Sequence, residues 1–335
     1  MPPVEEQPRP DSERGGTEPS ARIPPRLAAA IVVGTRRDRA ARALGALYKQ
    51  TAIDAMEIVI IDIGDAAAAP LTAPPEVRLV YLRPGQGVTW AEARAEGVRH
   101  ARAPIVAFVE EHCIPAMDWA EILIAVHEGP WAAVGYAFTN ANPRTYVGRA
   151  CWFADYGLWA HPAARGTTRF LPGNNVSYKR DLLLALGTRL ELALGADFNV
   201  QEAFLKQRLP LFLEARALVA HENHERLGDL LQANHMYCRL LATGRARTHS
   251  WGWGRRLLYG LAVPFAAPIL KTLRLARSLR GRRVLLPAFI AASPVILITY
   301  CWSAVGESLG YLLGAGSAEW RFKWWELESL RGSRV

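Results

Sequence analysis

Residues 27–64 read LAAAIVVGTRRDRAARALGALYKQTAIDAMEIVIIDIG. The apolar run at 27–33 predicts a buried strand, and a second apolar run at 57–63 predicts another. Between them, residues 40–50 repeat apolar side chains at helical spacing. A strand, a helix and a strand in this order predict two parallel strands joined by a right-handed crossover.

The same alternation continues along the chain. Apolar runs at 77–82 and 105–109 predict further strands, and residues 90–101 have a helical pattern. The expected fold class is therefore α/β, with a mostly parallel sheet flanked by helices. Because ligands of such sheets bind beyond the carboxyl ends of the strands, polar residues after each run are binding candidates. They are Thr35, Asp62, Gln86, Glu110, Glu111 and His112.

The region that follows has weaker patterns. Residues 130–169 are rich in aromatic side chains and glycine, and we expect a strand, a loop and a short helix there around a cleft. Further helices are expected at 181–186, 199–207 and 230–241, and a strand at 211–220. That strand leads into His221-Glu-Asn-His224.

Three regions are expected along the 335 residues. Residues 1–25 are rich in Pro, Glu, Ser and Arg without an apolar run, which predicts a disordered segment and no signal peptide. Residues 26–250 are expected to form the α/β domain, and residues 251–335 a basic and hydrophobic helical tail. The four cysteines lie far apart, which favours reduced thiols over disulfides or a zinc site.

The formal net charge of +9 is concentrated in one segment. Eight Lys or Arg residues and no acid lie between Arg255 and Arg283, so the rest of the chain is close to neutral. These basic residues are interleaved with Leu, Ala and Phe beside a long apolar run. The pattern favours anionic membrane lipids as partners and argues against nucleic acid.

The tail contains one stretch that is long enough to cross a bilayer. Residues 285–305 carry no charge over 21 positions, and a span needs roughly 20 residues. The apolar stretch 257–270 is expected to be too short. Tryptophans at 320, 324 and 325 follow with Arg and Lys, as interfacial anchors do. Prolines within 285–305 leave a shallow insertion open, and a buried hairpin of a soluble domain is the other alternative.

Two glycines near the end of this stretch predict close helix packing. Gly306 and Gly310 lie four residues apart, which lets another helix approach closely. We expect them to pack against residues 257–270 or against a second copy of the chain. Glu307 between them is expected to face protein or the headgroup region, since a carboxylate in lipid is costly.

A set of ordered motifs links the strands to a known family. They are IVVGT at 31–35, LYKQT at 47–51, IIDIG at 60–64, GVTWAEARAEG at 87–97, IVAFVEEHCIP at 105–115 and PGNNVSYKR at 172–180. In this order the motifs resemble those of the family 2 glycosyltransferases, over about residues 27–245. The resemblance implies a GT-A fold and inverting transfer of a sugar from a nucleoside diphosphate sugar.

The resemblance also assigns roles to single residues. His112 stands at the last position of the family's D-x-D motif, which holds a divalent cation on the diphosphate. A histidine ligand suits Mn²⁺ better than Mg²⁺, and either cation is expected. The other reading of this segment is a solvated cluster at a strand end, with Asp62 as a helix cap or loop residue. The nucleotide-sugar site would contain Thr35, Asp62, Arg94, Glu110 and Glu111.

The family's inverting chemistry needs a base that takes a proton from the acceptor hydroxyl. The corresponding position is Asp197, with Glu202 as the reserve. His221 would complete the cation site, and a His that caps the turn is the equal alternative. The loop at the donor and acceptor would contain Gly173, Asn174 and Asn175.

The expected function is transfer from a UDP-sugar, or less readily a GDP-sugar, to a hydroxyl of a lipid-linked or polysaccharide acceptor. The basic tail places the catalytic domain on the cytoplasmic, inner face of the plasma membrane. The alternative is a catalytically silent GT-A module that acts as a binding or assembly subunit of an envelope-polysaccharide complex. Its support is Glu-Glu-His at the cation position, Ile63 for an acid and Ala196 before the base. A nucleotidyltransferase is a third possibility, and no feature predicts an oligomeric state.

Overall fold

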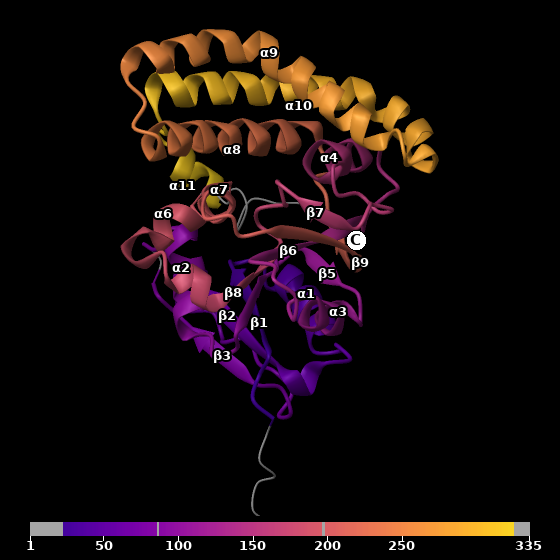
Figure 1. Cartoon of the computed structure of the whole chain (residues 1–335), viewed down its shortest axis with the longest axis vertical. Coiled ribbons are helices and arrows are strands. Elements are labelled where there is room, and N and C mark those ends of the chain that lie inside the picture. The colour runs from indigo at the N-terminus through magenta and orange to yellow at the C-terminus, as the bar shows by residue number, and fades with distance from the viewer. Residues whose placement is uncertain (1–22, 86, 196–197, 325–335) are drawn as a thin grey trace, which may run out of the picture.

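A computed structural model describes residues 23–324, except for 86 and 196–197. Figure 1 shows a body that contains the sheet, with a layer of long helices across one end. Residues 1–22 of the expected disordered segment lie outside the described residues, as do the binding candidate Gln86 and the predicted anchor Trp325.

One mixed sheet of nine strands lies at the centre of the described chain. Its order is β3-β2-β1-β4-β8-β6-β9-β5, with β7 paired to β9. Strands β3, β2, β1 and β4 are parallel, as are β6 and β9, whereas β8, β5 and β7 pair antiparallel. The predicted α/β class is confirmed. The strands are β1 Leu27–Val33, β2 Met56–Asp62, β3 Leu79–Leu82, β4 Ile105–Phe108, β5 Cys113–Pro115, β6 Ala133–Asn140, β7 Gly166–Thr168, β8 Val176–Lys179 and β9 Leu211–His221.

The two strands in the opening stretch are buried along their whole length. Their continuous apolar sequence is what a parallel strand covered on both faces requires. The helix before β4 begins at a capping box, in which Thr89 and Glu92 satisfy each other's backbone N–H groups. The helices of the body are α1 Arg37–Leu47, α2 Trp90–His100, α3 Trp119–Val126, α4 Tyr146–Tyr156, α5 Arg180–Leu184, α6 Leu190–Leu194 and α7 Phe198–Lys206.

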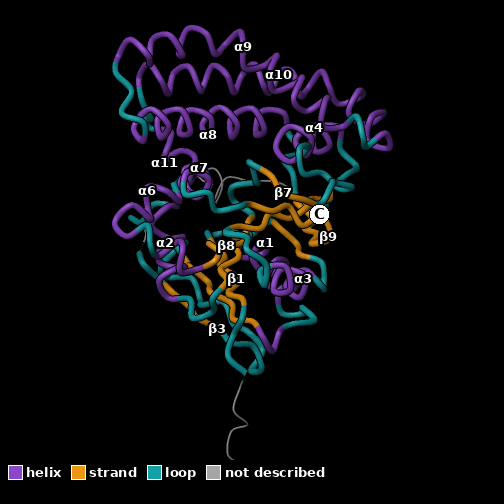
Figure 2. Tube along the Cα trace, in the orientation of Figure 1, coloured by secondary structure: helices purple, strands orange, loops and turns teal. Residues whose placement is uncertain are grey.

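Four further helices follow, and the three long ones form the layer at the end of the body. The four are α8 Leu227–Thr248, α9 Trp253–Leu279, α10 Leu286–Leu313 and α11 Ala318–Trp324. In Figures 1 and 2, α8, α9 and α10 run alongside one another across the end of the body. Two of the helices, α9 and α10, are long and apolar enough to cross a membrane.

The expectation that 257–270 is too short to span was wrong, because α9 continues through both of its prolines. Pro264 has no N–H to donate to the carbonyl of Gly260. The hydroxyl of Ser308 on α10 donates to that carbonyl instead, at 2.6 Å. In α10, Ser293 supplies the bond to Ile290 O that Pro294 cannot make. Serine hydroxyls therefore satisfy the carbonyl oxygens that Pro264 and Pro294 leave without a backbone donor.

The two glycines of α10 pack against a helix that the sequence did not indicate. A Cβ on Gly306 would lie 2.1 Å from the carbonyl oxygen of His235, and one on Gly310 2.3 Å from that of Arg239. Both carbonyls belong to α8. The predicted close approach is real, but the predicted partner was wrong, because α10 lies against α8 on this face.

A buried histidine gives the fold a predictable acid sensitivity. Nε2 of His127, after α3, lies 2.9 Å from Oγ of Ser177 in β8. Burial, with Lys179 nearby, lowers the pKa of His127 from 6.5 to about 3. The unfolded chain therefore takes up a proton here before the folded chain does. The stability from neutral His127 is present above about pH 6.5 and is lost as the pH falls toward about 3.

We expect His127→Gln to reduce the difference in unfolding free energy between about pH 7 and about pH 4 by about 3 kcal/mol. Urea unfolding at the two pH values measures this difference. The matched control is His100→Gln on the exposed surface of α2, which should leave the difference unchanged. An unchanged difference in His127→Gln would assign the acid sensitivity to another group.

Candidate functional site

A cavity of about 550 Å³ lies between the ends of the sheet strands and the helical layer. Glu110 and His112 reach it from the segment after β4, and His221 from the end of β9. Antiparallel pairing of β5 with β9 sets Cys113 directly opposite His221, which brings the two segments together. The helical layer contributes Asn234, Lys271, Arg274 and Tyr300 to the cavity wall.

Several hydrogen bonds hold the carboxylate of Glu110 at the cavity. Its oxygens accept from the hydroxyl of Tyr156 at 2.8 Å, from Nδ2 of Asn174 at 2.8 Å and from Nδ2 of Asn175. Burial acts to raise the pKa of Glu110, but His112, His221 and the Tyr156 hydroxyl outweigh it and keep that pKa below its usual range. Glu110 is therefore a fixed anion.

Two imidazoles face this anion. Nε2 of His112 and Nε2 of His221 lie 3.0 Å apart, and each lies 3.7 Å from Oε2 of Glu110. Burial lowers the pKa of His112 well below its usual value, so the ring is neutral and can offer a lone pair. Nδ1 of His221 lies 3.0 Å from Oδ1 of Asn223, which leaves its Nε2 to face the cavity.

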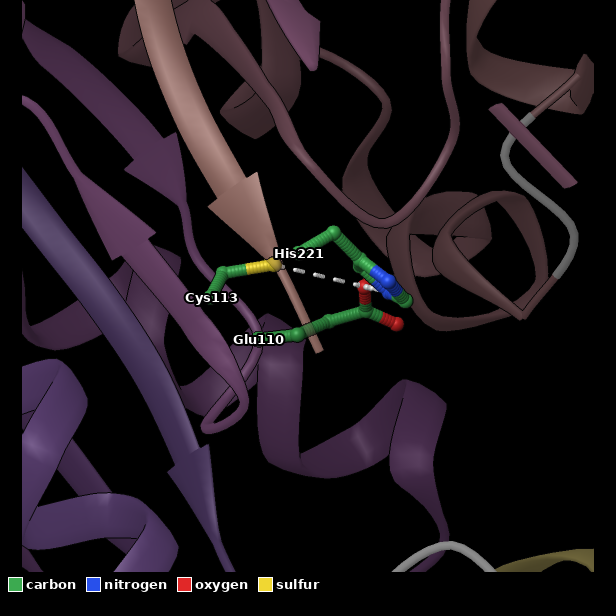
Figure 3. A group of neighbouring side chains, drawn as sticks. All are labelled: Glu110, Cys113 and His221. Atoms are coloured by element: carbon green, nitrogen blue, oxygen red, sulfur yellow. Dashed lines mark hydrogen bonds and ion pairs between the residues drawn. The ribbon is translucent and has the colours of Figure 1, made fainter. Parts of the chain in front are cut away.

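These three donor atoms fit a divalent cation. A point equidistant from them lies about 2 Å from each, which is the usual length of bonds from a metal to histidine or carboxylate. Figure 3 shows Glu110, Cys113 and His221 pointing toward one another, with one possible ligand atom each within 4.8 Å of the others. Burial raises the pKa of Cys113 and favours its neutral thiol, so the carboxylate and the imidazoles are the better ligands.

A neighbouring histidine also has spare bonding capacity. Nδ1 of His224 is buried and has no hydrogen-bond partner within the described part of the chain. Burial lowers the pKa of His224 to about 3, so its ring is neutral. His224 lines the same cavity, where a ligand can take up this nitrogen.

Asn223 is expected to control cation binding through His221. Its Oδ1 fixes the His221 ring, and its Nδ2 donates to Oδ1 of Asn140 at 2.9 Å. Removal of such an outer partner weakens metal binding by about 10- to 100-fold. We expect a loss near the lower end for Asn223→Ala, measured by titration with Mn²⁺. Asn223→Asp keeps an acceptor for Nδ1–H and should retain most of the affinity; equal affinity in the Ala variant would contradict the role.

Asp62 ends β2, as predicted, but protein groups already occupy its carboxylate. It accepts from Arg37 at 2.8 Å, from the Tyr81 hydroxyl and from Arg83 at 3.3 Å. Burial acts to raise the pKa of Asp62, but the bonds from Arg37 and Tyr81 prevail and lower it. Asp62 does not line the cavity of about 550 Å³.

Glu111 and Thr35 lie at the end of β1, away from the cavity lining. Oε2 of Glu111 accepts from the backbone N–H of Gly34 at 2.9 Å, and Oε1 lies 3.8 Å from Nη1 of Arg39. Burial raises the pKa of Glu111 to about 7. Thr35 is exposed. In this structure Glu111 joins the β4 segment to β1.

Arg94 holds the predicted donor and acceptor loop from behind. Its guanidinium is buried, donates to the carbonyl oxygens of Gly173 and Leu194, and lies 4.1 Å from the ring centroid of Phe108. Gly173 and Asn174 line the cavity, and Asn175 bonds Glu110 beneath it. Arg94 therefore positions the loop and does not line the cavity itself.

Neither predicted base is found among the described residues that line the cavity. Asp197 lies outside the described residues. Glu202 on α7 pairs with Lys206 at 2.8 Å and His249 at 3.3 Å, and it is not part of the cavity lining.

Sequence reasoning missed a carboxylate on α4. Asp155 lines the cavity and accepts from Nδ2 of Asn234 at 3.2 Å, and burial raises its pKa. Asp155 precedes Tyr156 in the aromatic region at 130–169, which has no clear period. Its position next to a tyrosine is the one sequence signal that marks it.

Comparison with known proteins identifies relatives of the described body. A family model described as "Glycosyl transferase family 2" matches residues 30–186. Validoxylamine A glucosyltransferase from Streptomyces hygroscopicus subsp. jinggangensis (strain 5008) is 28% identical over 160 residues, which cover 40% of this chain and 38% of that protein. The chain thus matches well under half the length of this curated relative.

A solved structure shares the fold along nearly the whole chain. It is the mannosyltransferase PcManGT from Pyrobaculum calidifontis in complex with GDP-Man and Mn²⁺, with a TM-score of 0.50 and 17% identity. The alignment covers 90% of this chain and 88% of the other. The similarity is one of fold, and it includes the sheet and part of the helical layer.

Proposed function

Because residues 30–186 are a family 2 glycosyltransferase domain, we propose that the protein transfers a sugar with inversion from a nucleoside diphosphate sugar to a hydroxyl group. A UDP-sugar is the first choice of donor and a GDP-sugar the second. The acceptor is lipid-linked or a polysaccharide. The observation that carries the proposal is the convergence of Glu110, His112 and His221 at one wall of a large cavity.

The donor atoms of these three residues would hold a divalent cation, and their imidazoles favour Mn²⁺ over Mg²⁺. When bound, such a cation neutralises the charge that develops on the leaving nucleoside diphosphate. Tyr156, Asn174 and Asn175 keep the Glu110 carboxylate in place for this. In this proposal Asp62, with Arg37, binds the nucleotide beyond the cavity, and Glu111, Thr35 and Arg94 support that end of the sheet.

The chain must also remove a proton. The acceptor oxygen forms a bond to the anomeric carbon as the bond to the diphosphate oxygen breaks, and the hydroxyl proton passes to a carboxylate. Asp197 is our first candidate for this base, and Asp155 is the candidate within the described cavity wall. The raised pKa of Asp155 supports it, because a base with a pKa nearer neutrality accepts a proton more readily.

The helical layer supports an amphiphilic acceptor. Lys271 and Arg274 of α9 and Tyr300 of α10 line the cavity, while other side chains of the same helices are exposed and apolar. An acceptor with a lipid tail and a polar head would meet both environments. We place the catalytic domain at 26–250 and the membrane-associated tail at 251–335, on the inner face of the membrane.

Two measurements test the function. Titration of UDP and GDP with and without Mn²⁺ should give binding that depends on the cation. A panel of UDP- and GDP-sugars with membrane extract as the acceptor should give transfer from one of them. Absence of binding by every nucleotide would overturn the donor site. Binding without transfer or hydrolysis of any sugar would favour the silent binding subunit.

A further inference from the structure

We propose that α9 and α10 lie in the plane of the membrane surface as a hairpin, with apolar side chains among the lipids, and that neither helix crosses the bilayer. The ligand of this surface is a bilayer with anionic headgroups. The inference rests on the membrane association in the proposed function, and it specifies how that association is made.

The polarity of α10 is the reverse of that of a helix on a soluble protein. Its exposed side chains are apolar, and its polar ones face the protein. Glu307 is directed to Arg245 and Lys271, with only 13% of its side chain exposed. In water the polar face would lie outside. The exposed large side chains of α10 are Ile290, Leu297, Ile298, Trp302, Val305 and Leu313, and the buried polar ones are Thr299, Ser303 and Ser308.

The helix α9 has an apolar outer surface as well. Residues 257–270 carry no charge, and Leu258, Leu261, Phe265 and Ile269 are exposed at helical spacing. These side chains contribute to a surface with no covering element in the described part of the chain. Side chains of this kind enter the boundary between headgroups and acyl chains when a helix lies on a bilayer.

Both ends of α10 are bonded to residues of the proposed catalytic domain at 26–250. Before its first turn, Arg282 donates to the carbonyl oxygens of Ala160 at 2.7 Å and Gly157 at 3.1 Å, just after α4. Beyond its last turn, Nε of Arg239 on α8 donates to Gly314 O at 2.8 Å. A helix that crosses a bilayer has its ends on opposite sides, whereas both ends of α10 contact the catalytic side.

The middle of α10 is held in the same way. The Tyr146 hydroxyl donates to Ala291 O at 2.7 Å, and the Tyr300 hydroxyl donates to Ala154 O at 3.2 Å. With 28 residues α10 is about 42 Å long, more than the roughly 30 Å of the hydrocarbon core. If α10 crossed that core, α4 and the cavity wall would be placed in it, so the helix must lie along the surface.

The charges at the ends of the hairpin select the headgroups. Arg255 is exposed near the start of α9, and Arg277, Arg280 and Arg283 are exposed near the turn into α10. Basic residues at both ends of an apolar face are suited to anionic lipid. Trp253, exposed at the start of α9, adds an aromatic side chain of the kind found at the interface.

Vesicle sedimentation of the full chain tests the surface. Wild type should bind phosphatidylcholine vesicles that contain phosphatidylglycerol at least about tenfold more tightly than phosphatidylcholine alone. Phe265→Glu and Ile298→Glu, at side chains 77% and 47% exposed, should each weaken binding at least about tenfold. Met117→Glu, at a side chain 64% exposed on the body, is the matched control and should change nothing. Unchanged binding in both helix variants would overturn the surface.

Accessibility of the hairpin turn tests the orientation. A cysteine replaces Gly281 in the turn, where a Cβ meets nothing within 4 Å, in a Cys301→Ser background. A second protein carries Met117→Cys on the body. Sealed spheroplasts of the expression host are treated with a membrane-impermeant maleimide before and after lysis. Position 281 should react whenever position 117 does. The in-plane orientation would be overturned if positions 281 and 117 reacted from opposite sides of the membrane, or if position 281 did not react either before or after lysis.

Nucleotide titration of the same variants separates the two proposals. The in-plane hairpin would be rejected, and the proposed function kept, by either of two results in proteins that still bind nucleotide. One is a turn at position 281 on the far side of the membrane, and the other is the absence of vesicle binding. Absence of nucleotide binding by the wild-type protein would reject the proposed function, whatever the orientation of the helices.

Discussion

A Glu110→Gln protein is expected to transfer sugar about 100 to 1,000 times more slowly than wild type, the range for loss of a preorganised electrostatic group. The substitution removes the anion that lies 3.7 Å from both His112 and His221. It also turns an amide N–H₂ toward the donors of Asn174 and Asn175, which bond the carboxylate in the native protein. The measurement is the rate of product formation with the donor found by the sugar panel, together with titration of Mn²⁺.

The matched control is Glu96→Gln, which makes the same chemical change at a partly exposed residue of α2 paired with Arg99. It should keep wild-type activity. A thermal melt of each variant shows whether the protein is folded under the assay conditions. A folded Glu110→Gln protein with full activity and unchanged Mn²⁺ affinity would remove Glu110 from the site.

A Gly306→Ala protein is expected to lose roughly 1–3 kcal/mol of unfolding free energy, the usual result of adding a methyl group to a close-packed contact. The new Cβ would lie 2.1 Å from a backbone oxygen of α8, which cannot rotate away as a side chain can. The helices must separate along the contact that also includes Gly310. Urea unfolding of the full chain in detergent measures the change.

Gly45→Ala in α1 is the control for the same substitution. A Cβ there meets nothing within 4 Å, and alanine in a helix interior is favoured over glycine by roughly 0.5–1 kcal/mol. The two variants should therefore shift stability in opposite directions. Equal stability of Gly306→Ala and wild type would mean that α8 and α10 are not in this close contact.

The parallel half of the sheet could be predicted well because its signal is local. Strand β1 has the predicted bounds, β2 begins and ends one residue earlier than predicted, and β4 ends one residue earlier, since a fully buried strand needs a continuous apolar run. The predicted length of α9 was too short because prolines in a sequence indicate the end of a helix. The compensating hydroxyl of Ser308 comes from another helix, more than forty residues away along the chain.

The site residues could be predicted only where a titratable side chain ends a strand or comes directly after one. Glu110, His112 and His221 were chosen for that reason, and the structure brings them together, although their roles stay predictions. Asp155 and Tyr156 were missed because α4 reaches the cavity through long-range packing, which leaves no periodic signal. The occupied carboxylate of Asp62 also depends on partners from other elements.

The helix α4 connects the two surfaces that the protein would use. Near its start the Tyr146 hydroxyl bonds the backbone of α10, in its middle Phe153 contacts Phe289, and its last residue, Tyr156, bonds Glu110. Eleven residues of one helix thus join the proposed lipid-facing layer to the carboxylate that we propose for the cation site. A displacement of α10 by lipid would reach Glu110 as a rigid-body shift of α4. By linkage, a bilayer that favours the ligand-bound position of α4 would tighten donor binding, and bound donor would tighten membrane binding by the same factor.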